Sequence, residues 1–147
     1  MLLGNTISEN YYGITFGTAS SYNEIYNNTI INNSMNLDIC DGSNYNIFSK
    51  NTFINERPYP SGSIRFGDTY FNKIYHNNFI NCYRVSDEGY INSWDNGPIE
   101  GGNYWSDHNC TGNPSNGSQP YIIDEDSIDH YPFEDPNGWL LWASSQN

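Results

Sequence analysis

The sequence predicts an all-β solenoid of about four coils, with three short strands per coil and an acidic, aromatic cap at the C-terminal end. The first observation is a repeat in which Asn is followed by Thr or Asn and then by an apolar residue. The repeats are spaced by 23, 23 and 26 residues, a period typical of stacked arrays. The second observation is a sharp change in charge near residue 85. The repeated asparagines are Asn5, Asn28, Asn51 and Asn77.

Each period holds three predicted strands. The first strand of each coil follows the repeated Asn, and a second apolar series recurs at residues 14–16, 37–39, 64–66 and 91–93. A third series, at residues 22–25, 45–48 and 71–74, leads back to the next repeated Asn. The apolar residues alternate with polar ones and are flanked by Asn, Thr, Ser and Gly, as strands joined by short turns require.

Asparagine dominates the composition, at 24 of 147 residues. Asn tolerates the left-handed backbone region and bonds to its own neighbouring backbone, so we expect it at a tight corner that repeats in every coil. Equivalent residues of stacked coils lie about 4.8 Å apart, the spacing of β-strands. We therefore expect the four repeated asparagines to form a ladder of hydrogen-bonded side-chain amides.

The charge divides the chain into two parts. Residues 1–84 carry six acidic residues and all five basic ones, whereas residues 85–147 carry eleven acidic residues and no basic one. The C-terminal part is therefore a poor partner for nucleic acid or for an anionic membrane surface. No apolar run is long enough to suggest insertion into a membrane. Divalent cations and neutral polymers remain open as partners.

Other features of the sequence favour an extracellular or cell-surface location. The chain has four N-glycosylation sequons, and it opens directly on a repeat with no basic start, so we expect a segment of a longer repeat protein. The sequons begin at Asn27, Asn32, Asn109 and Asn116. Three scattered cysteines are too few for a zinc site, while one disulfide with one free thiol stays open. The cysteines are Cys40, Cys82 and Cys110.

Three aspartates are expected at equivalent positions on successive coils. Counting four residues on from the second strand series gives Thr18, Asp41, Asp68 and Asp95. Like charges stacked in this way raise one another's pKa unless something neutralises them. The first interpretation is that each Asp caps a strand with an Asx-type turn. The alternatives are a calcium site, because hard cations take several carboxylate oxygens, and a carboxyl pair of the kind that retaining glycosidases use.

The C-terminal third carries the most specific motifs. These are SWDNG at 93–97, GGNYWSD at 101–107, PYIID at 120–124 and DHYP at 129–132. With the NxTIxxN rhythm of the repeats, they resemble the NosD-like and archaeal surface β-helix repeat proteins over residues 4–133. The resemblance implies a right-handed parallel β-helix, with coils at residues 1–95 and a capping segment at residues 96–147 packed on the last coil. Relatives often carry an Asp-rich loop where this chain has residues 112–118, so we expect no calcium in that loop.

NosD itself is linked to copper-site assembly, which makes the histidines candidate ligands. His76, His108 and His130 show no close ligand spacing, and the chain has no Met-rich or Cys-His cluster. His76 falls at a coil corner, where we expect a solvated side chain. We therefore expect no copper site and no required cofactor, with calcium as the one metal still open.

Large aromatic residues gather near the C-terminal end, and two roles are open to them. A solenoid must cover the apolar end of its column, so a terminal repeat rich in large side chains is expected as a cap. The alternative is a sugar-stacking platform formed by exposed faces of Trp94, Tyr104 and Trp105. Burial of the two tryptophans would decide for the cap.

These observations favour a noncatalytic surface scaffold or adhesion module that binds a glycan or another envelope protein. The first alternative is part of a polysaccharide-acting enzyme, a hydrolase, lyase or epimerase, that uses Asp41, Asp68 and Asp95. The second alternative is a solenoid that self-associates end to end instead of remaining a monomer, because unpaired strand edges template further pairing. No constellation in the sequence is specific enough to name a reaction, and one fold hosts enzymes, adhesins and spacers alike.

Overall fold

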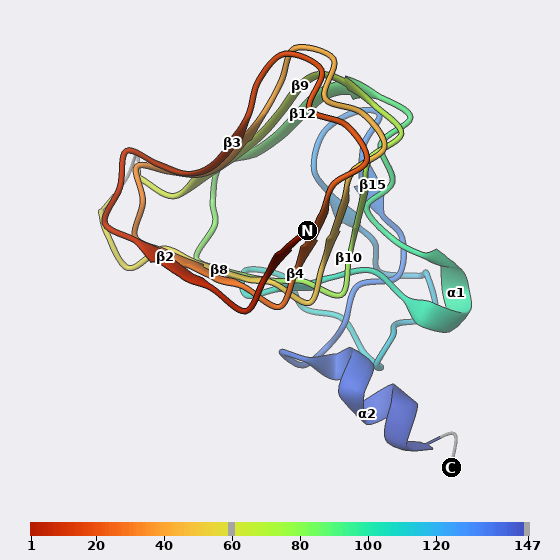
Figure 1. The fold of residues 1–147 in the computed structure, drawn as a ribbon. Helices are drawn as coiled ribbons and strands as arrows, with labels where there is room; N and C mark the ends of the chain where they lie inside the picture. Colours follow the sequence, from red (N-terminus) through yellow and green to blue (C-terminus); the bar gives the residue numbers. More distant parts are fainter. Residues whose placement is uncertain (59–60, 146–147) are drawn as a thin grey trace.

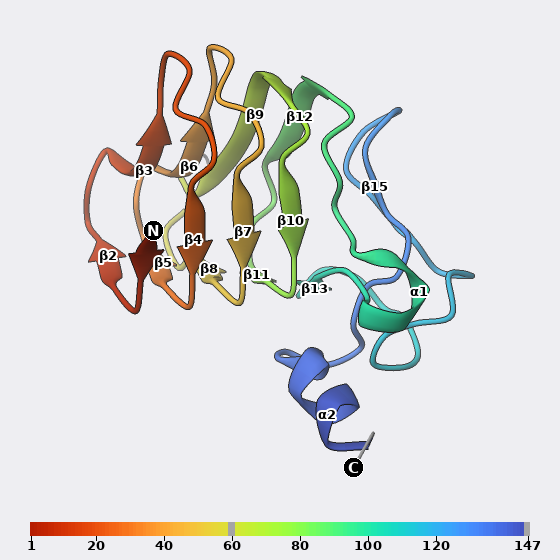
Figure 2. The ribbon, with the colours of Figure 1, turned by 45° about the vertical axis from the view of Figure 1, so that its right-hand side comes forward.

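The chain winds into successive coils, which Figure 1 shows in a view close to the axis of the stack. The computed structural model describes residues 1–58 and 61–145. Three parallel sheets, here called sheets A, B and C, run along the stack, and each coil adds one strand to each sheet (Figure 2). This arrangement confirms the predicted all-β, right-handed parallel β-helix with three short strands per coil and about four coils.

The strands of each sheet are ordered by coil. Sheet A consists of β1 (Leu2–Leu3), β4 (Glu24–Tyr26), β7 (Ile47–Ser49) and β10 (Lys73–Tyr75). Sheet B consists of β2 (Thr6–Ser8), β5 (Thr29–Ile31), β8 (Thr52–Ile54), β11 (Asn78–Ile80) and β13 (Tyr104–Trp105). Sheet C consists of β3 (Tyr12–Phe16), β6 (Met35–Ile39), β9 (Ser63–Tyr70) and β12 (Val85–Tyr90).

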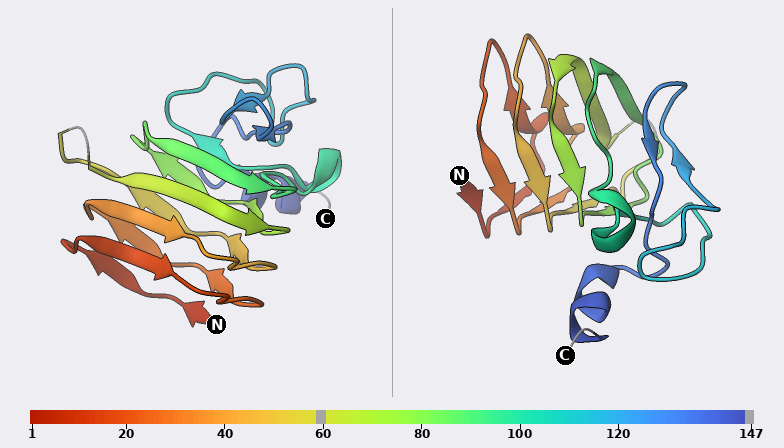
Figure 3. Two further views of the ribbon diagram at one scale, coloured as in Figure 1. Left: turned by 90° about the horizontal axis from the view of Figure 1, so that it is seen from above. Right: turned by 90° about the vertical axis from the view of Figure 1, so that its right-hand side faces the viewer.

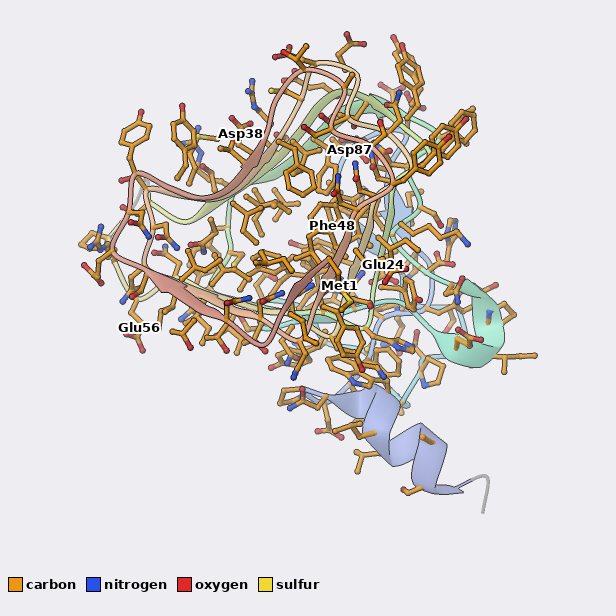
Figure 4. The ribbon with its side chains drawn as sticks, in the orientation of Figure 1. Met1, Glu24, Asp38, Phe48, Glu56 and Asp87 are labelled. Carbon is orange, nitrogen blue, oxygen red and sulfur yellow. The ribbon has the colours of Figure 1, made fainter. Side chains whose placement is uncertain are left out.

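The core is a column of apolar side chains enclosed by the three sheets. In sheet B the register places Ile30 beside Phe53 and Phe53 beside Phe79, and the two phenylalanine rings stack with their centroids 5.2 Å apart. All three side chains are at most 1% exposed. Phe48 of sheet A is buried in the same column (Figure 4). Full burial of a side chain of this size contributes about 1.5–3 kcal/mol, which is why the alternating apolar residues specify the column.

The coil corners use residues in the left-handed backbone region, but these are not the repeated asparagines. The residue before each repeated Asn has the positive φ, as at Asn27 (54°), Lys50 (56°) and His76 (58°). The expectation that the repeated Asn itself turns the chain is therefore wrong. The side chain of this Asn instead forms hydrogen bonds with the neighbouring coils. A second corner has the same form, with positive φ at Tyr22, Tyr45, Phe71 and Ile91.

The fourth coil differs from the sequence expectation in its register. The repeat predicts residues 91–93 as the strand beside residues 64–66, but the structure pairs Val85 with Ile64. The fourth strand of sheet C is therefore β12, and Ser93 instead bridges Lys73 of sheet A. The prediction fails because Val85 follows Ile64 by 21 residues instead of the expected 27, and the pairing of β12 with β9 shifts register near the end of β12.

A C-terminal segment packs on the last coil, as both views of Figure 3 show. It contains α1 (Gly97–Glu100), the antiparallel hairpin of β14 (Tyr121–Ile122) and β15 (Ile128–Asp129), and α2 (Gly138–Ser145). The predicted division at residue 95 is not a break in the stack, because β13 pairs with β11 and extends sheet B. Residues 146–147 of the predicted cap lie outside the described residues.

Aromatic contacts around His76 hold α2 beside the last coil. The His76 ring stacks on Trp139 with the ring centroids 5.5 Å apart, and it meets Phe133 edge-on. Its Nε2 lies 2.7 Å from the carbonyl oxygen of Glu100. The side chain is 8% exposed, so the expectation of a solvated corner histidine is wrong. Burial lowers the pKa of His76, which favours the neutral ring.

Candidate functional site

The repeated asparagines lie on successive coils and form a continuous column of hydrogen bonds. From Asn28 onward, each Oδ1 accepts two bonds from the Asn of the preceding coil, one from its backbone N and one from its Nδ2. At Asn51, for example, both donors belong to Asn28 and both distances are 3.0 Å. This column, here called ladder 1, contains Asn5, Asn28, Asn51, Asn77 and Asn103.

The amides of ladder 1 also satisfy backbone groups of neighbouring coils. Asn51 Nδ2 donates to the carbonyl of Ile25, and Asn77 Nδ2 donates to the carbonyl of Phe48, each at 2.8 Å. Both asparagines are 0% exposed. Buried polar groups are costly unless they are hydrogen-bonded. Ladder 1 therefore holds the coils together at the corner between sheets A and B.

A second column, here called ladder 2, runs along the corner between sheets C and A. It contains Asn23, Asn46, Asn72 and Asn92. Each of them directly follows a positive-φ residue, as the asparagines of ladder 1 do at Asn28, Asn51 and Asn77. A shorter ladder 3 joins Asn10, Asn33 and Asn36. Sequence reasoning placed the first members of ladder 2 in a strand series and missed their role, although an aromatic residue followed by Asn recurs there.

Ladder 1 ends on a buried aspartate. Asp129 Oδ2 accepts from Asn103 N at 2.7 Å and from Trp105 Nε1 at 2.9 Å, while Oδ1 accepts from Tyr131 N at 3.2 Å. Asp129 is 0% exposed. A carboxylate only accepts hydrogen bonds, so it ends a column of amides without leaving a further donor to be satisfied.

Ladder 2 ends in the same way, on Asp87 (Figure 4). Its Oδ1 accepts from Asn92 Nδ2 at 2.8 Å, and its Oδ2 accepts from Trp94 Nε1 at 2.7 Å. Both ladders therefore end on an aspartate that also binds a tryptophan indole. Sequence reasoning gave neither aspartate this role, although Asp129 opens the DHYP motif and the 26-residue spacing from Asn77 continues to residues 103 and 129.

Burial of Asp129 gives the stability of the fold a pH dependence. Desolvation raises the pKa of Asp129 to about 7, although hydrogen bonds from Trp105 and Asn103 act against that shift. A carboxyl whose pKa is higher in the folded state stabilises the fold fully below its unfolded pKa of about 4, and this stabilisation is lost as the pH rises through 7. We expect the free energy of unfolding to fall between about pH 4 and pH 7, by up to about 1.4 kcal/mol per pH unit, and to level off above pH 7.

Denaturant unfolding at a series of pH values measures this slope, and Asp129→Asn is the control. The variant has no titrating carboxyl at this position, so its slope should be shallower even though its absolute stability is lower. Equal slopes in the two proteins would show that other carboxyl groups cause the pH dependence.

Of the three aspartates predicted to stack, two lie at equivalent turns of adjacent coils and the third does not. Asp41 and Asp68 lie on adjacent coils, where Gly42 N donates to the Asp68 carbonyl at 3.0 Å, and both side chains are exposed. Their positive φ angles of 53° and 48° fit the turn interpretation. Asp95 lies apart and pairs with His130, with 3.0 Å between Oδ2 and Nδ1. The register of the fourth coil separates Asp95 from the other two, so a site of three carboxylates does not form.

The described residues contain no group of three or more His, Cys, Asp or Glu that could hold a metal ion. His108 is engaged elsewhere, with its Nε2 2.9 Å from the carbonyl oxygen of Gln119. The three cysteines are free thiols in this structure, and burial raises the pKa of Cys82 to about 12. The calcium alternative therefore has no ligand cluster among these residues.

The two tryptophans considered for a sugar platform belong to the core. Trp94 and Trp105 are each 1% exposed. Trp105 stacks between Phe79 and Tyr121, with centroid distances of 4.2 and 3.9 Å, and Tyr104 is partly buried. Neither indole offers a face to a sugar ring, so the platform hypothesis loses its main support. The two indoles instead cover the end of the apolar column.

An open groove crosses the stack where the chain passes from sheet B to sheet C. One part, of about 480 Å³, is lined by Tyr11, Ser34, Met35, Ser61, Ser63 and Arg84. An adjoining part, of about 260 Å³, adds Ile64, Arg65, Val85 and Ser86. Met35, Ser63 and Arg84 line both parts, so we treat them as one feature, here called the sheet C groove. Its lining residues come from four successive coils.

The sheet C groove carries two arginines in a protein with a net charge of −12. Arg65 is fixed in place, because its Nε donates to Asp38 Oδ1 at 2.8 Å and the two residues are register partners in β9 and β6. Asp38 is 6% exposed, whereas the Arg65 side chain is 42% exposed. A guanidinium has five N–H donors, and the bond to Asp38 uses one of them. The groove therefore presents positioned donors to solvent.

Comparison with known proteins supports the resemblance to the NosD-like proteins over the coils. Of the described helices, none is both long and apolar enough to cross a membrane. No curated protein and no solved structure matches the chain. The model of the family described as periplasmic copper-binding protein (NosD) matches residues 4–110, which is more than half of the chain and includes every strand of sheets B and C. The chain therefore belongs to the NosD family.

Proposed function

We propose that this NosD-family chain is a noncatalytic module of the cell surface or periplasm that binds a glycan in the sheet C groove. The observation that carries the proposal is the groove, which is open, has both polar and apolar lining residues, and takes them from four coils. Three strand spacings of about 4.8 Å give it a length of about 14 Å. A site of this length admits several sugar rings of a polysaccharide that continues beyond both ends.

The groove lining matches the chemistry of a sugar chain. Ser34, Ser61 and Ser63 supply hydroxyl groups that both donate and accept, as sugar hydroxyls do. Tyr11 is 68% exposed at one end and adds an apolar ring edge and face. Met35 lines both parts and contributes apolar surface between the polar groups.

Arg65 and Arg84 favour a glycan that carries carboxylate groups. Guanidinium and carboxylate form short, charge-assisted hydrogen bonds that are stronger than neutral ones. The negative charge of the chain opposes this binding only weakly, because eleven of its seventeen acidic residues lie beyond residue 84. Exposed charges more than about 8 Å apart are largely screened at physiological salt.

Neither copper chemistry nor hydrolysis enters this proposal. The family description names copper, but the described residues hold no cluster of ligands that fits the ion. The enzyme alternative uses Asp41, Asp68 and Asp95, but Asp95 pairs with His130, and neither Asp41 nor Asp68 lines the sheet C groove. A binding module requires only the groove.

Arg84→Ala tests the proposal. We expect this variant to bind an acidic glycan, selected on a glycan array, about tenfold or more weakly, since a hydrogen bond to a charged group is worth about 1.5–3 kcal/mol. Lys73→Ala is the matched control, because it removes the same charge from an exposed residue of sheet A, outside the groove. Calcium and EDTA should leave binding unchanged.

Two outcomes would contradict the proposal. Equal losses in Arg84→Ala and Lys73→Ala would show that net charge, rather than the groove, governs binding. An array with no bound glycan in either calcium or EDTA would remove the glycan function and leave a protein-binding scaffold.

A further inference from the structure

The structure separates the four N-glycosylation sequons of the chain from one another. Transfer of a glycan requires an exposed Asn side chain, an amide nitrogen without a partner, and a stretch of chain that a transferase can bind without breaking a sheet. The sequons begin at Asn27, Asn32, Asn109 and Asn116. They differ in all three respects.

The first two sequons are built into the stack of coils. Asn27 precedes Asn28, which is 1% exposed in ladder 1, and the hydroxyl residue Thr29 belongs to β5 inside sheet B. Asn32 is partly buried, its Oδ1 accepts from Glu56 N at 2.8 Å, and its Nδ2 donates to Glu56 Oε2 at 3.3 Å. A transferase would have to open sheet B at the first site and displace Glu56 at the second.

The third sequon is anchored at its middle residue. Asn109 and Thr111 are exposed, but Cys110 between them is buried, with its Sγ 3.7 Å from the carbonyl oxygen of Pro132. Thr111 N also donates to Gln119 Oε1 at 3.0 Å. These contacts hold the backbone of the sequon against the capping segment, so it enters a transferase site less easily than a free turn does.

The fourth sequon lies between β13 and β14, outside the three sheets and at the C-terminal end of the stack (Figure 3). Asn116 and Ser118 are both exposed. Ser118 Oγ donates to Asn116 Oδ1 at 2.6 Å, and Ser118 N donates to the same oxygen at 3.1 Å. Gly117 between them has a φ of 85°, in the region that favours glycine. Among residues 1–58 and 61–145, no acceptor takes a hydrogen bond from Asn116 Nδ2.

We propose that Asn116 is a glycosylation site, to which a transferase attaches a glycan from a lipid-linked sugar phosphate. A bond forms between Asn116 Nδ2 and the anomeric carbon of the sugar. The bond from that carbon to the phosphate oxygen breaks, and the lipid phosphate leaves. Nδ2 gives one proton to a base of the transferase. This inference is independent of the sheet C groove, whose lining residues all precede residue 87.

The hydrogen bond from Ser118 favours this transfer. Negative charge develops on Asn116 Oδ1 as Nδ2 loses its proton, and a donor already placed where charge develops stabilises that charge. The Ser118 hydroxyl occupies this place in the free protein. Because the amide and the hydroxyl are both exposed, a transferase can bind them without unfolding the cap.

Glycan occupancy of the folded, complete chain tests the site. The chain is incubated with a purified single-subunit oligosaccharyltransferase and its lipid-linked oligosaccharide, and each sequon is analysed by peptide mass spectrometry. We expect occupancy at Asn116 to exceed that at Asn27 by about tenfold or more, because Thr29 becomes accessible only when β5 opens. Ser118→Ala should slow transfer to Asn116 by about tenfold or more, whereas Ser118→Thr keeps a hydroxyl and should retain it.

Asn109→Gln is the matched control, because it removes an exposed sequon of the same segment and should leave occupancy at Asn116 unchanged. The substitutions at the exposed Ser118 should leave Tm unchanged, so that slower transfer cannot come from unfolding. A free sequon peptide shows that the transferase is active. An unmodified Asn116 under these conditions would overturn the proposal. Equal or greater occupancy at another sequon would also overturn it, because the motif alone, and not the exposed turn, would then select the site.

Discussion

Asn51→Ala is expected to lower the free energy of unfolding by about 3–5 kcal/mol. The substitution removes the Oδ1 that accepts from Asn28 N and Asn28 Nδ2, and it removes the Nδ2 that donates to the Ile25 carbonyl and to Asn77 Oδ1. Asn51 and Asn77 are 0% exposed and Asn28 is 1% exposed, so water does not replace these partners. A buried donor or acceptor left without a partner costs about 1–3 kcal/mol. Denaturant unfolding monitored by circular dichroism measures the loss.

Two control substitutions test whether the loss of stability comes from the ladder or from the removal of any asparagine. Asn5→Ala removes an exposed member at the start of the same ladder, where only the donation to Asn28 Oδ1 is lost between side chains, and it should cost less than about 1 kcal/mol. Asn109→Ala removes an exposed asparagine outside the ladders and should be nearly neutral. A loss at Asn51 no larger than the loss at Asn5 would refute the ladder as a source of stability.

The period of the sequence was sufficient to predict ladder 1 because strand spacing is fixed. Residues that recur once per coil must stack about 4.8 Å apart, and Asn is the side chain that can accept from one neighbour and donate to the next. The same reasoning stopped at Asn77, because the next members, Asn103 and Asp129, lie in a segment without recognisable coils. Their spacing of 26 residues continues the series, so the signal was present in the sequence.

The fourth coil could not be placed from the sequence, because apolar alternation alone does not fix register there. Val85 and Ile91 both begin short segments with a plausible strand pattern. The choice between them changes the position in the coil that is assigned to every later residue. The structure selects Val85, and Asn92 then joins ladder 2 at a spacing of 20 residues from Asn72. The stacked-aspartate site depended on the other choice, which is why it did not form.

Aromatic content was a poor guide to function, because the role of the tryptophans depends on partners that are not adjacent in the sequence. Trp94 and Trp105 carry an indole N–H, and a buried indole needs an acceptor. Asp87 in β12 and Asp129 in the cap supply those acceptors, a pairing across 7 and 24 residues that no local motif reveals. The sheet C groove was likewise invisible in the sequence, because its serines and arginines come from several coils and become neighbours only when the coils stack.

Gly102→Ala is expected to destabilise the fold by about 3 kcal/mol or more. A Cβ at this position would lie 1.8 Å from Asp129 Oδ1, far inside any allowed contact. The carboxyl group has no room to withdraw, because Asn103 N, Trp105 Nε1 and Tyr131 N all bond to it. Thermal and denaturant unfolding should both show the loss. Gly102, the second glycine of the GGNYWSD motif, is therefore required because Asp129 of the DHYP motif leaves no room for a Cβ atom.

Gly17→Ala is the control for the loss of a glycine, because a Cβ at this position would meet no atom of a non-neighbouring residue within 4 Å and its φ is not in the left-handed region. It should be neutral or slightly stabilising, since alanine restricts the unfolded chain. The double variant Gly102→Ala, Asp129→Ala removes the group that the new methyl meets. If the contact with Asp129 causes the loss, Gly102→Ala should cost far less in the Asp129→Ala background than in the parent chain. An unchanged cost would place the strain elsewhere in the cap and would break the link between the two motifs.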